Sequence, residues 1–128
     1  MPLILTSLDR ALASLKAALA LPKDDIVRDS VIKRFEYTYE LAWKMMQRWL
    51  KENVGAEQID LLTRKDLFRL AAKKQLIPSP LPWFDYHQSR NQTAHAYNVN
   101  KAEQVYEIAV QFVPDAEHLL RELQQRND

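Results

Sequence analysis

The sequence has 128 residues with a single glycine and no cysteine, and its 18 lysines and arginines against 17 aspartates and glutamates give a formal net charge of +1. The lack of cysteine excludes disulfide scaffolds, thiolate nucleophiles and cysteine zinc sites, and the small net charge excludes bulk attraction to nucleic acid or membranes. Any binding to such partners must therefore use a local patch of charge.

Length and hydrophobicity predict one folded domain. A chain of this length buries a single core, and 47% hydrophobic with 27% charged residues is typical of a globular protein, so we expect residues 1–128 to form one domain. The single glycine, Gly55, does not supply the regular turns of sandwiches and barrels, which favours an all-α fold. No apolar run approaches the roughly 20 residues that cross a bilayer, and the N-terminus lacks a signal-peptide pattern. We therefore expect a cytoplasmic protein that does not bind membranes.

The first two predicted helices are defined by apolar spacing and by their ends. Leucines at positions 5, 8, 12, 15 and 19 recur every three or four residues, so they form one stripe along a helix that ends near Pro22. The segment 24–55 begins with acidic residues suited to a helix N-terminus and ends at Gly55, which can take a left-handed capping conformation. Apolar residues cover a broad face of this longest helix, so we expect it to contact two neighbours.

A third helix is predicted from Thr63 to about Leu76. The Thr63 hydroxyl can accept a hydrogen bond from the amide of Asp66, in a variant of the capping box. Prolines at 78, 80 and 82 follow, and they restrict the residues before them to extended conformations. We expect a stiff connector here that redirects the chain.

Two further helices complete the predicted fold. A fourth helix fits residues 83–95, and a fifth runs from about Asn100, which has capping-box spacing with Glu103, to about Arg126. Pro114 lies inside the fifth helix and is expected to kink it, since proline lacks the donor for the carbonyl one turn earlier. Together these segments predict an antiparallel up-and-down bundle of four or five helices.

The stretch SRNQTAHAYN, residues 89–98, departs from the amphipathic pattern. At ~100° per residue, Asn91 and His95 share one face of a helix, whereas Arg90 and His95 lie ~140° apart. One regular helix cannot aim Arg90 and His95 at the same ligand. Either the helix unwinds around His95, where the residues are poor helix formers, or a twofold-related partner supplies the missing group.

These polar residues have two interpretations. In the first, Arg90, Asn91 and His95 only cap the fourth helix. In the second, they converge on a phosphodiester. Arginine holds the phosphate by paired hydrogen bonds, while histidine moves a proton between an attacking 2′-hydroxyl and a leaving oxygen near neutral pH. This chemistry needs neither a metal nor a cofactor.

The same stretch resembles a known family signature. The order R-N-x-x-x-H-x-Y is formed by Arg90, Asn91, His95 and Tyr97. It is similar to the motif of the HEPN family, in the branch paired with minimal nucleotidyltransferases. The resemblance extends to RDSVIKRFEYTYELAWK, residues 28–44, and to Trp83, so it spans most of the chain.

The resemblance implies a dimeric helical bundle that acts either as the ribonuclease toxin of a toxin–antitoxin pair or as the substrate-binding partner of a nucleotidyltransferase. It implies that Arg90 and His95 form the catalytic pair, supported by Asn91, in a cleft that both protomers line and that cuts RNA without metal. It also implies that the partner, a minimal nucleotidyltransferase antitoxin, attaches AMP to Tyr97 and so blocks the cleft. Two positions depart from the pattern: Gln75, where many relatives are expected to have glycine, and Ser89, where an acid often precedes the arginine.

A basic segment lies in the predicted third helix. Its positive residues are Arg64, Lys65, Arg69, Lys73 and Lys74. A solvated helix face explains this charge, but it is also the first place to seek phosphate contacts if the protein binds RNA.

Other polar and aromatic residues have less specific patterns. Glu36 and Glu40 are spaced like half of a di-iron site, but the matching Glu-x-x-His elements are missing, so we predict no metal. Tyr37, Trp43 and Trp49 fit a core better than base stacking. The remaining histidines, His87 and His118, are expected to be surface or half-buried residues, although His87 lies one turn before Asn91.

Three functions are compatible with the sequence. The first is a dimeric, metal-independent ribonuclease restrained by a nucleotidyltransferase. The second is a non-catalytic module that presents nucleotide or another substrate to that transferase. The third is a bundle used only for assembly. Cleavage of RNA by the purified protein, or growth arrest when it is expressed alone, separates the first from the others.

Overall fold

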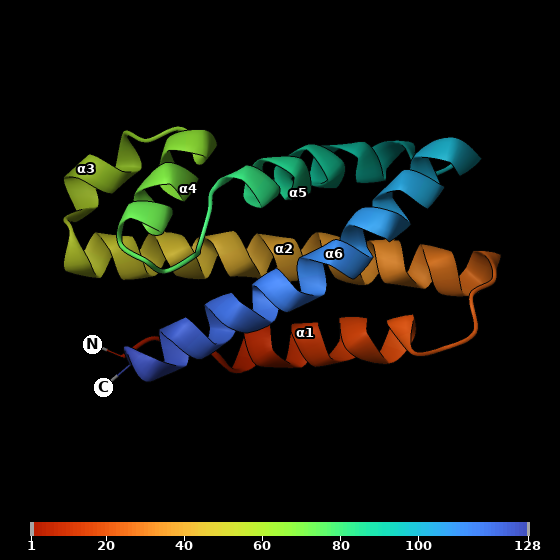
Figure 1. The fold of residues 1–128 in the computed structure, drawn as a ribbon, viewed down its shortest axis with the longest axis horizontal. Helices are drawn as coiled ribbons and strands as arrows, with labels where there is room; N and C mark the ends of the chain where they lie inside the picture. The colour runs from red at the N-terminus through yellow and green to blue at the C-terminus, as the bar shows by residue number, and fades with distance from the viewer. Residues whose placement is uncertain (1, 128) are drawn as a thin grey trace.

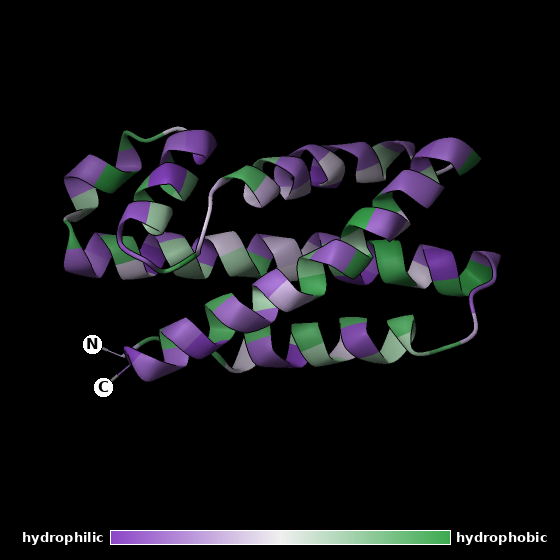
Figure 2. Ribbon diagram, in the orientation of Figure 1, coloured by the Kyte–Doolittle hydropathy of each residue, from purple (hydrophilic) through white to green (hydrophobic). Residues whose placement is uncertain are grey.

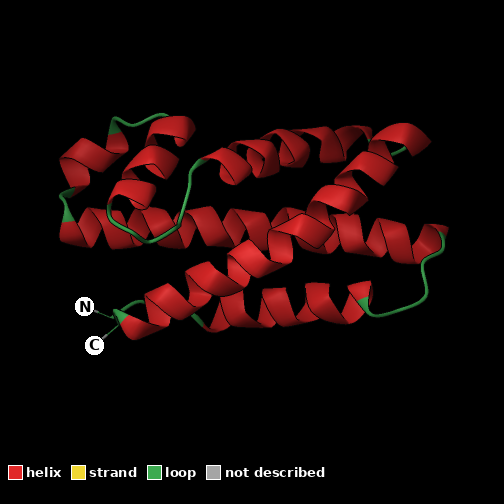
Figure 3. Ribbon diagram, viewed as in Figure 1, coloured by secondary structure: helices red, strands yellow, loops and turns green. Residues whose placement is uncertain are grey.

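The computed structural model describes residues 2–127, and the regular elements in this range are all helices (Figures 1 and 3). They are α1 (Thr6–Leu19), α2 (Asp25–Asn53), α3 (Ala56–Asp60), α4 (Arg64–Lys73), α5 (Leu81–Gln92), the 3₁₀ turn η1 (Thr93–His95) and α6 (Val99–Gln125). The predicted all-α fold is confirmed, and the five predicted helices correspond to α1, α2, α4, α5 and α6. The short helix α3 is additional, because five residues are too few to show an apolar period.

Helix α2 is the centre of the bundle and contacts every other helical element. Helix α1 runs antiparallel along one side of it, α4 and α5 lie on the other side, and α6 crosses diagonally from the end of α5 back toward α1 (Figure 1). Both ends of the chain meet at one corner. There the Asn127 side chain accepts a hydrogen bond from the amide of Leu3 (2.6 Å) and donates one to the Leu3 carbonyl (2.8 Å).

The helices are amphipathic, and hydrophobic and hydrophilic residues alternate along the ribbon (Figure 2). Aromatic rings from three helices form the middle of the core. Phe112 of α6 packs edge-on against Phe35 of α2 and against Trp83 and Tyr86 of α5, with ring centroids 5.1–5.7 Å apart. Such contacts add roughly 0.5–1.5 kcal/mol each beyond burial, so they hold α5 firmly against α2 and α6. Within residues 2–127, no helix is both long and apolar enough to cross a bilayer.

The helix ends confirm one predicted cap and correct another. The Thr63 hydroxyl accepts from the amide of Asp66 at 3.1 Å, as predicted for the start of α4. The predicted cap at Asn100 is wrong. Helix α6 begins at Val99, and the side chain of Asn98 accepts from the amides of Asn100 (3.0 Å) and Lys101 (3.3 Å). Asn98 is the residue with extended backbone, which an N-cap requires.

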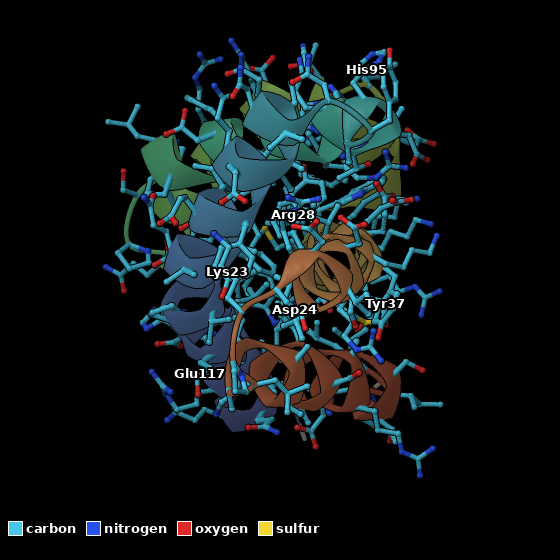
Figure 4. All side chains as sticks on the ribbon, turned by 90° about the vertical axis from the view of Figure 1, so that its right-hand side faces the viewer. Lys23, Asp24, Arg28, Tyr37, His95 and Glu117 are labelled. Carbon is cyan, nitrogen blue, oxygen red and sulfur yellow. The ribbon has the colours of Figure 1, made fainter. Side chains whose placement is uncertain are left out.

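Helix α6 is continuous from Val99 to Gln125, with Pro114 inside it. Its first turns are tied to the loop between α1 and α2. Glu103 of α6 pairs with Lys23 of that loop and with the buried Arg28 of α2 (3.3 Å), and both partners lie at the end of the bundle that Figure 4 faces. These ion pairs fix the start of α6, which directly follows the polar stretch.

Gln75 ends α4 in an unusual backbone conformation. Its φ is +63°, in the left-handed region that residues other than glycine rarely adopt. The amide of Leu76 bonds the carbonyl of Ala71 at 2.9 Å, as in a Schellman cap, and the carbonyl of Gln75 accepts from Arg126 at 3.0 Å. Because the backbone bonds require this conformation, the departure from glycine noted in the sequence leaves local strain.

We predict that Gln75→Gly stabilises the protein. Glycine removes the cost of the left-handed conformation, about 1 kcal/mol, and keeps the backbone bonds to Ala71 and Arg126. Urea unfolding followed by circular dichroism measures the change. The matched variant Gln104→Gly, at an exposed helical position of α6, should instead destabilise the protein by about 1 kcal/mol. Equal destabilisation by both variants would show that Gln75 is not strained.

Candidate functional site

The polar stretch forms the junction between α5 and α6. Helix α5 ends at Gln92, η1 follows over Thr93–His95, and α6 starts at Val99. The carbonyl of Arg90 accepts from the backbone amide of Thr93 and also from the Thr93 hydroxyl, the latter at 2.8 Å, so Thr93 closes the end of α5. The chain therefore unwinds at His95, which is one of the two geometries considered from the sequence.

Arg90 is held by carboxylates of α2. Its Nε donates to Oε1 of Glu40 at 3.0 Å, and its Nη2 lies 3.9 Å from Oε1 of Glu36. The second oxygen of Glu40 accepts from the indole Nε1 of Trp43 at 3.0 Å. We call Glu36, Glu40, Trp43 and Arg90 the Arg90 cluster. The bond from Nε to Glu40 uses one of the five donors of the guanidinium and sets the orientation of the group. The Arg90 side chain is still 30% exposed.

His95, Tyr97 and Asn91 are exposed to solvent. The His95 and Tyr97 rings contact each other edge to face, with centroids 6.3 Å apart, and Tyr97 is 85% exposed. Figure 4 shows His95 at the outer edge of the bundle, beyond the end of α5. Within residues 2–127 no hydrogen bond joins His95 to Arg90. A single chain thus presents a fixed guanidinium and an accessible imidazole without bringing them into contact.

A second polar cluster lies one turn earlier on α5. The Tyr39 hydroxyl lies 2.9 Å from Nδ1 of His87, and Nη1 of Arg64 lies 3.3 Å from the same hydroxyl and 3.4 Å from Nδ1. We call Tyr39, Arg64 and His87 the His87 cluster. Arginine only donates, so Nδ1 must accept, which places the ring hydrogen on Nε2. Burial, and then the positive charge of Arg64, lower the pKa of His87 below its ordinary value, so the ring is neutral at pH 7.

Arg64 joins the two clusters. Its guanidinium carbon lies 3.3 Å from the centroid of the Trp43 ring, a close cation–π contact. Arg64 is therefore half-buried and faces α2, although it belongs to the segment whose charges were expected on a solvated face. The other four basic residues of that segment are exposed, and Arg69 pairs with Asp66 at 2.8 Å.

Sequence reasoning missed the partners of Arg90 and His87. The four-residue spacing of Glu36 and Glu40 is visible in the sequence, but its purpose depends on Arg90, which lies 50 residues away. Trp43 was assigned to the core and is instead half-buried at the edge of the site. In the described part of the chain, no three His, Cys, Asp or Glu side chains are grouped so as to hold a metal ion.

Comparisons with known proteins show the family of the chain. The family described as nucleotidyltransferase substrate binding protein like matches residues 3–125. A Haemophilus influenzae protein named probable ribonuclease HepT is 36% identical over 107 residues, which are 80% of this chain and 73% of that protein.

Two solved structures share the fold. A Haemophilus influenzae structure, described as revealing the fold of a substrate binding domain of a nucleotidyltransferase, has a TM-score of 0.89 and 31% identity and covers 95% of this chain and 100% of that one. A crystal structure of a Thermus thermophilus protein has a TM-score of 0.71 and 30% identity, over 93% and 97% of the two chains. The resemblance noted from the R-N-x-x-x-H-x-Y motif is confirmed.

We predict that His87 titrates below its ordinary pKa of 6.5, because burial and Arg64 both disfavour the imidazolium. Folding then disfavours protonation, so the stabilising effect of neutral His87 is present above pH 6.5 and is lost as the pH falls through its folded pKa. NMR of the imidazole C–H signals measures this pKa. Arg64→Gln should raise it, and Arg69→Gln, on the exposed face of the same helix, should not. A His87 pKa at or above 6.5 would contradict the assignment.

Proposed function

The chain belongs to the family of nucleotidyltransferase substrate-binding-like proteins, and we propose that it is a metal-independent ribonuclease toxin whose nucleotidyltransferase partner neutralises it by adding AMP. The observation that carries the proposal is the Arg90 cluster: Glu40 fixes Arg90 through Nε, while Nη2 lies 3.9 Å from Glu36, beyond hydrogen-bond distance, so the Nη donors can bind an anion. The exposed His95 follows five residues later and supplies an imidazole for proton transfer. The name of the 36% identical relative supports a ribonuclease.

Cleavage would proceed by attack of the ribose 2′-hydroxyl on the adjacent phosphorus. The bond from the 2′-oxygen to phosphorus forms and the bond to the 5′-oxygen breaks, which leaves a cyclic phosphate and a 5′-hydroxyl. His95 accepts the 2′-hydroxyl proton and returns a proton to the departing 5′-oxygen. Arg90 binds the nonbridging oxygens, where negative charge accumulates in the transition state, and Asn91 supports it there.

The active unit of this proposal is a homodimer. Arg90 faces the carboxylates of α2, whereas His95 lies in the exposed turn beyond α5, so a second protomer would bring the two groups of one cleft together. Two exposed apolar residues lie in and directly after this turn: Tyr97, and Val99 at the start of α6. Such residues favour contact with another chain.

A second candidate function has its own support. The solved structure with a TM-score of 0.89 is described as a substrate binding domain of a nucleotidyltransferase. In that role the chain would bind a nucleotide or another substrate without cutting RNA. RNA cleavage by the purified protein, with growth arrest on its expression alone, favours the toxin, and absence of both favours the binding subunit.

We expect His95→Ala and Arg90→Ala each to lower RNA cleavage by ~10²–10⁴-fold, because each removes a group that acts in the transition state. The unfolding free energy should change by less than about 1 kcal/mol, since His95 is exposed and the Arg90–Glu40 pair is partly solvated. Cleavage of a labelled RNA and urea unfolding measure the two effects.

The matched variants for this experiment are His118→Ala and Arg121→Ala on α6, and both should cut RNA normally. Mixing the two inactive variants should restore part of the activity if protomers share a cleft. Activity should also survive a chelator. Loss of activity through unfolding would favour a purely structural role for Arg90 and His95, and loss with the chelator would refute the metal-free mechanism.

We predict that the partner transferase, with ATP and magnesium, adds one or more AMP units to Tyr97. The phenolic oxygen attacks the α-phosphorus, pyrophosphate leaves and the phenol loses its proton. The hydroxyl is accessible because Tyr97 is 85% exposed, and its ring touches His95, so the added phosphate would crowd the cleft. Intact mass spectrometry measures the gain.

Tyr97→Phe should abolish this mass gain and leave an active toxin that the partner does not restrain. Tyr106→Phe, on α6, is the matched control and should be modified like the wild type. Unchanged mass of the wild type, or equal modification of Tyr97→Phe, would remove the assignment and favour the binding subunit.

A further inference from the structure

A pocket lies beside the two polar clusters and has no part in the proposed reaction. It has a volume of about 190 Å³ and opens between α2, α3, α4 and α5. Its lining residues are Trp43, Gln47, Ile59, Leu62, Thr63, Arg64, Leu67 and His87. Both basic side chains in this lining, Arg64 and His87, belong to the His87 cluster described above.

The size of the pocket limits what it can hold. Sites for whole drug-sized ligands usually measure roughly 300–1,000 Å³. A pocket of about 190 Å³ therefore fits a single planar ring system and leaves no room for an attached sugar and phosphates. An occupant with a larger body would have to keep that body outside.

The walls suit a flat aromatic ring with polar edges. Ile59, Leu62 and Leu67 supply apolar surface. Arg64 stacks on the Trp43 ring at 3.3 Å and covers that face of the indole, so the other face of its guanidinium supplies the plane on which an unpaired base can stack, as in RNA-binding proteins.

The polar atoms of the pocket suit the edge of a base. Nδ1 of His87 is engaged by the Tyr39 hydroxyl, so the neutral ring keeps its hydrogen on Nε2 and can donate it. The half-buried Gln47 adds an amide, which both donates and accepts. These two side chains could hydrogen-bond the oxygen and nitrogen atoms at a base edge.

The position of the pocket ties it to the proposed cleavage site. Glu40 bonds Arg90 with one oxygen and Trp43, a wall of the pocket, with the other. His87 lies one turn before Arg90 on α5, so a strand whose phosphate met Arg90 would bring a neighbouring nucleotide to the pocket. We propose that the pocket binds one nucleobase of the RNA strand, next to the phosphate held by Arg90. This inference rests on the proposed function and adds a subsite to it.

The test measures binding in the full-length His95→Ala protein, which keeps the pocket and slows cleavage. Fluorescence anisotropy gives the affinity for a single-stranded RNA that the wild type cuts, and for a series in which each nucleotide in turn is abasic. One position near the scissile phosphate should lose on the order of tenfold or more in affinity. Gln47→Leu and His87→Ala should each weaken binding of intact RNA. They should cause little further loss of affinity for the RNA that is abasic at that one position, because the missing base and the variants remove the same contact.

Matched variants on α6, Gln104→Leu and His118→Ala, should leave the affinities for intact and for abasic RNA unchanged. If losses from the abasic position and from the pocket variants simply add, the pocket does not hold that base. The proposal then fails, while RNA cleavage by the wild type still supports the ribonuclease.

Titration with the four nucleoside 5′-monophosphates separates the remaining outcomes. If RNA is neither bound nor cut, but a monophosphate shifts the NMR signals of His87 and the Trp43 indole, the pocket takes free nucleotides, and both the assignment to the RNA strand and the ribonuclease are overturned. If RNA is bound without any coupling to the pocket while monophosphates shift these signals, the pocket takes free nucleotides and the assignment to the RNA strand is overturned. No shift and no RNA binding would overturn both.

Discussion

The carboxylate of Glu40 is the contact on which the candidate site depends. It bonds Arg90 of α5 with one oxygen and Trp43 of its own helix with the other, so the direction of the guanidinium is set by the register between α2 and α5. A partly exposed ion pair adds only ~0–1 kcal/mol to stability, so it cannot be what holds the helices together. The packing of the buried aromatic rings around Phe112 holds the helices together. Core packing fixes the positions of α2 and α5, and the bond from Arg90 to Glu40 then fixes the orientation of the Arg90 side chain.

Two neighbouring residues of α2 position two different side chains of α5. Tyr39 is buried and turns its hydroxyl to His87, while the adjacent Glu40 lies at the half-exposed edge and reaches Arg90. His87 and Arg90 are themselves one turn apart on α5. One turn of each helix thus pairs with one turn of the other, and a shift of either helix along its axis would break both contacts. The register between α2 and α5 therefore lets the buried core position the partly exposed side chains of Arg90 and His87, although the core residues do not contact a ligand.

The sequence allows the helices to be predicted well, because amphipathic spacing and caps such as Thr63 are local. It predicts contacts between distant segments poorly. Arg64 sits among lysines and arginines and is therefore assigned to a solvated face, whereas Trp43 and Tyr39 draw it inward. Glu40 is spaced with Glu36 like half of a di-iron site, and the sequence excludes that metal site without indicating that the partner of Glu40 is Arg90. Arg90, Asn91 and His95 were singled out because their polar stretch departs from the amphipathic pattern, the family resemblance added Tyr97, and the roles of all four stay proposals.

The meeting of the chain ends through Leu3 and Asn127 has a consequence for how the molecule can be attached to others. The two ends emerge together at one corner, and the junction of α5 and α6 lies toward the opposite end of α2 (Figure 1). A domain, label or surface anchor joined to either end would therefore start from the same point and face away from His95 and Tyr97. Immobilised by either end, the protein would present the same surface to a partner in solution.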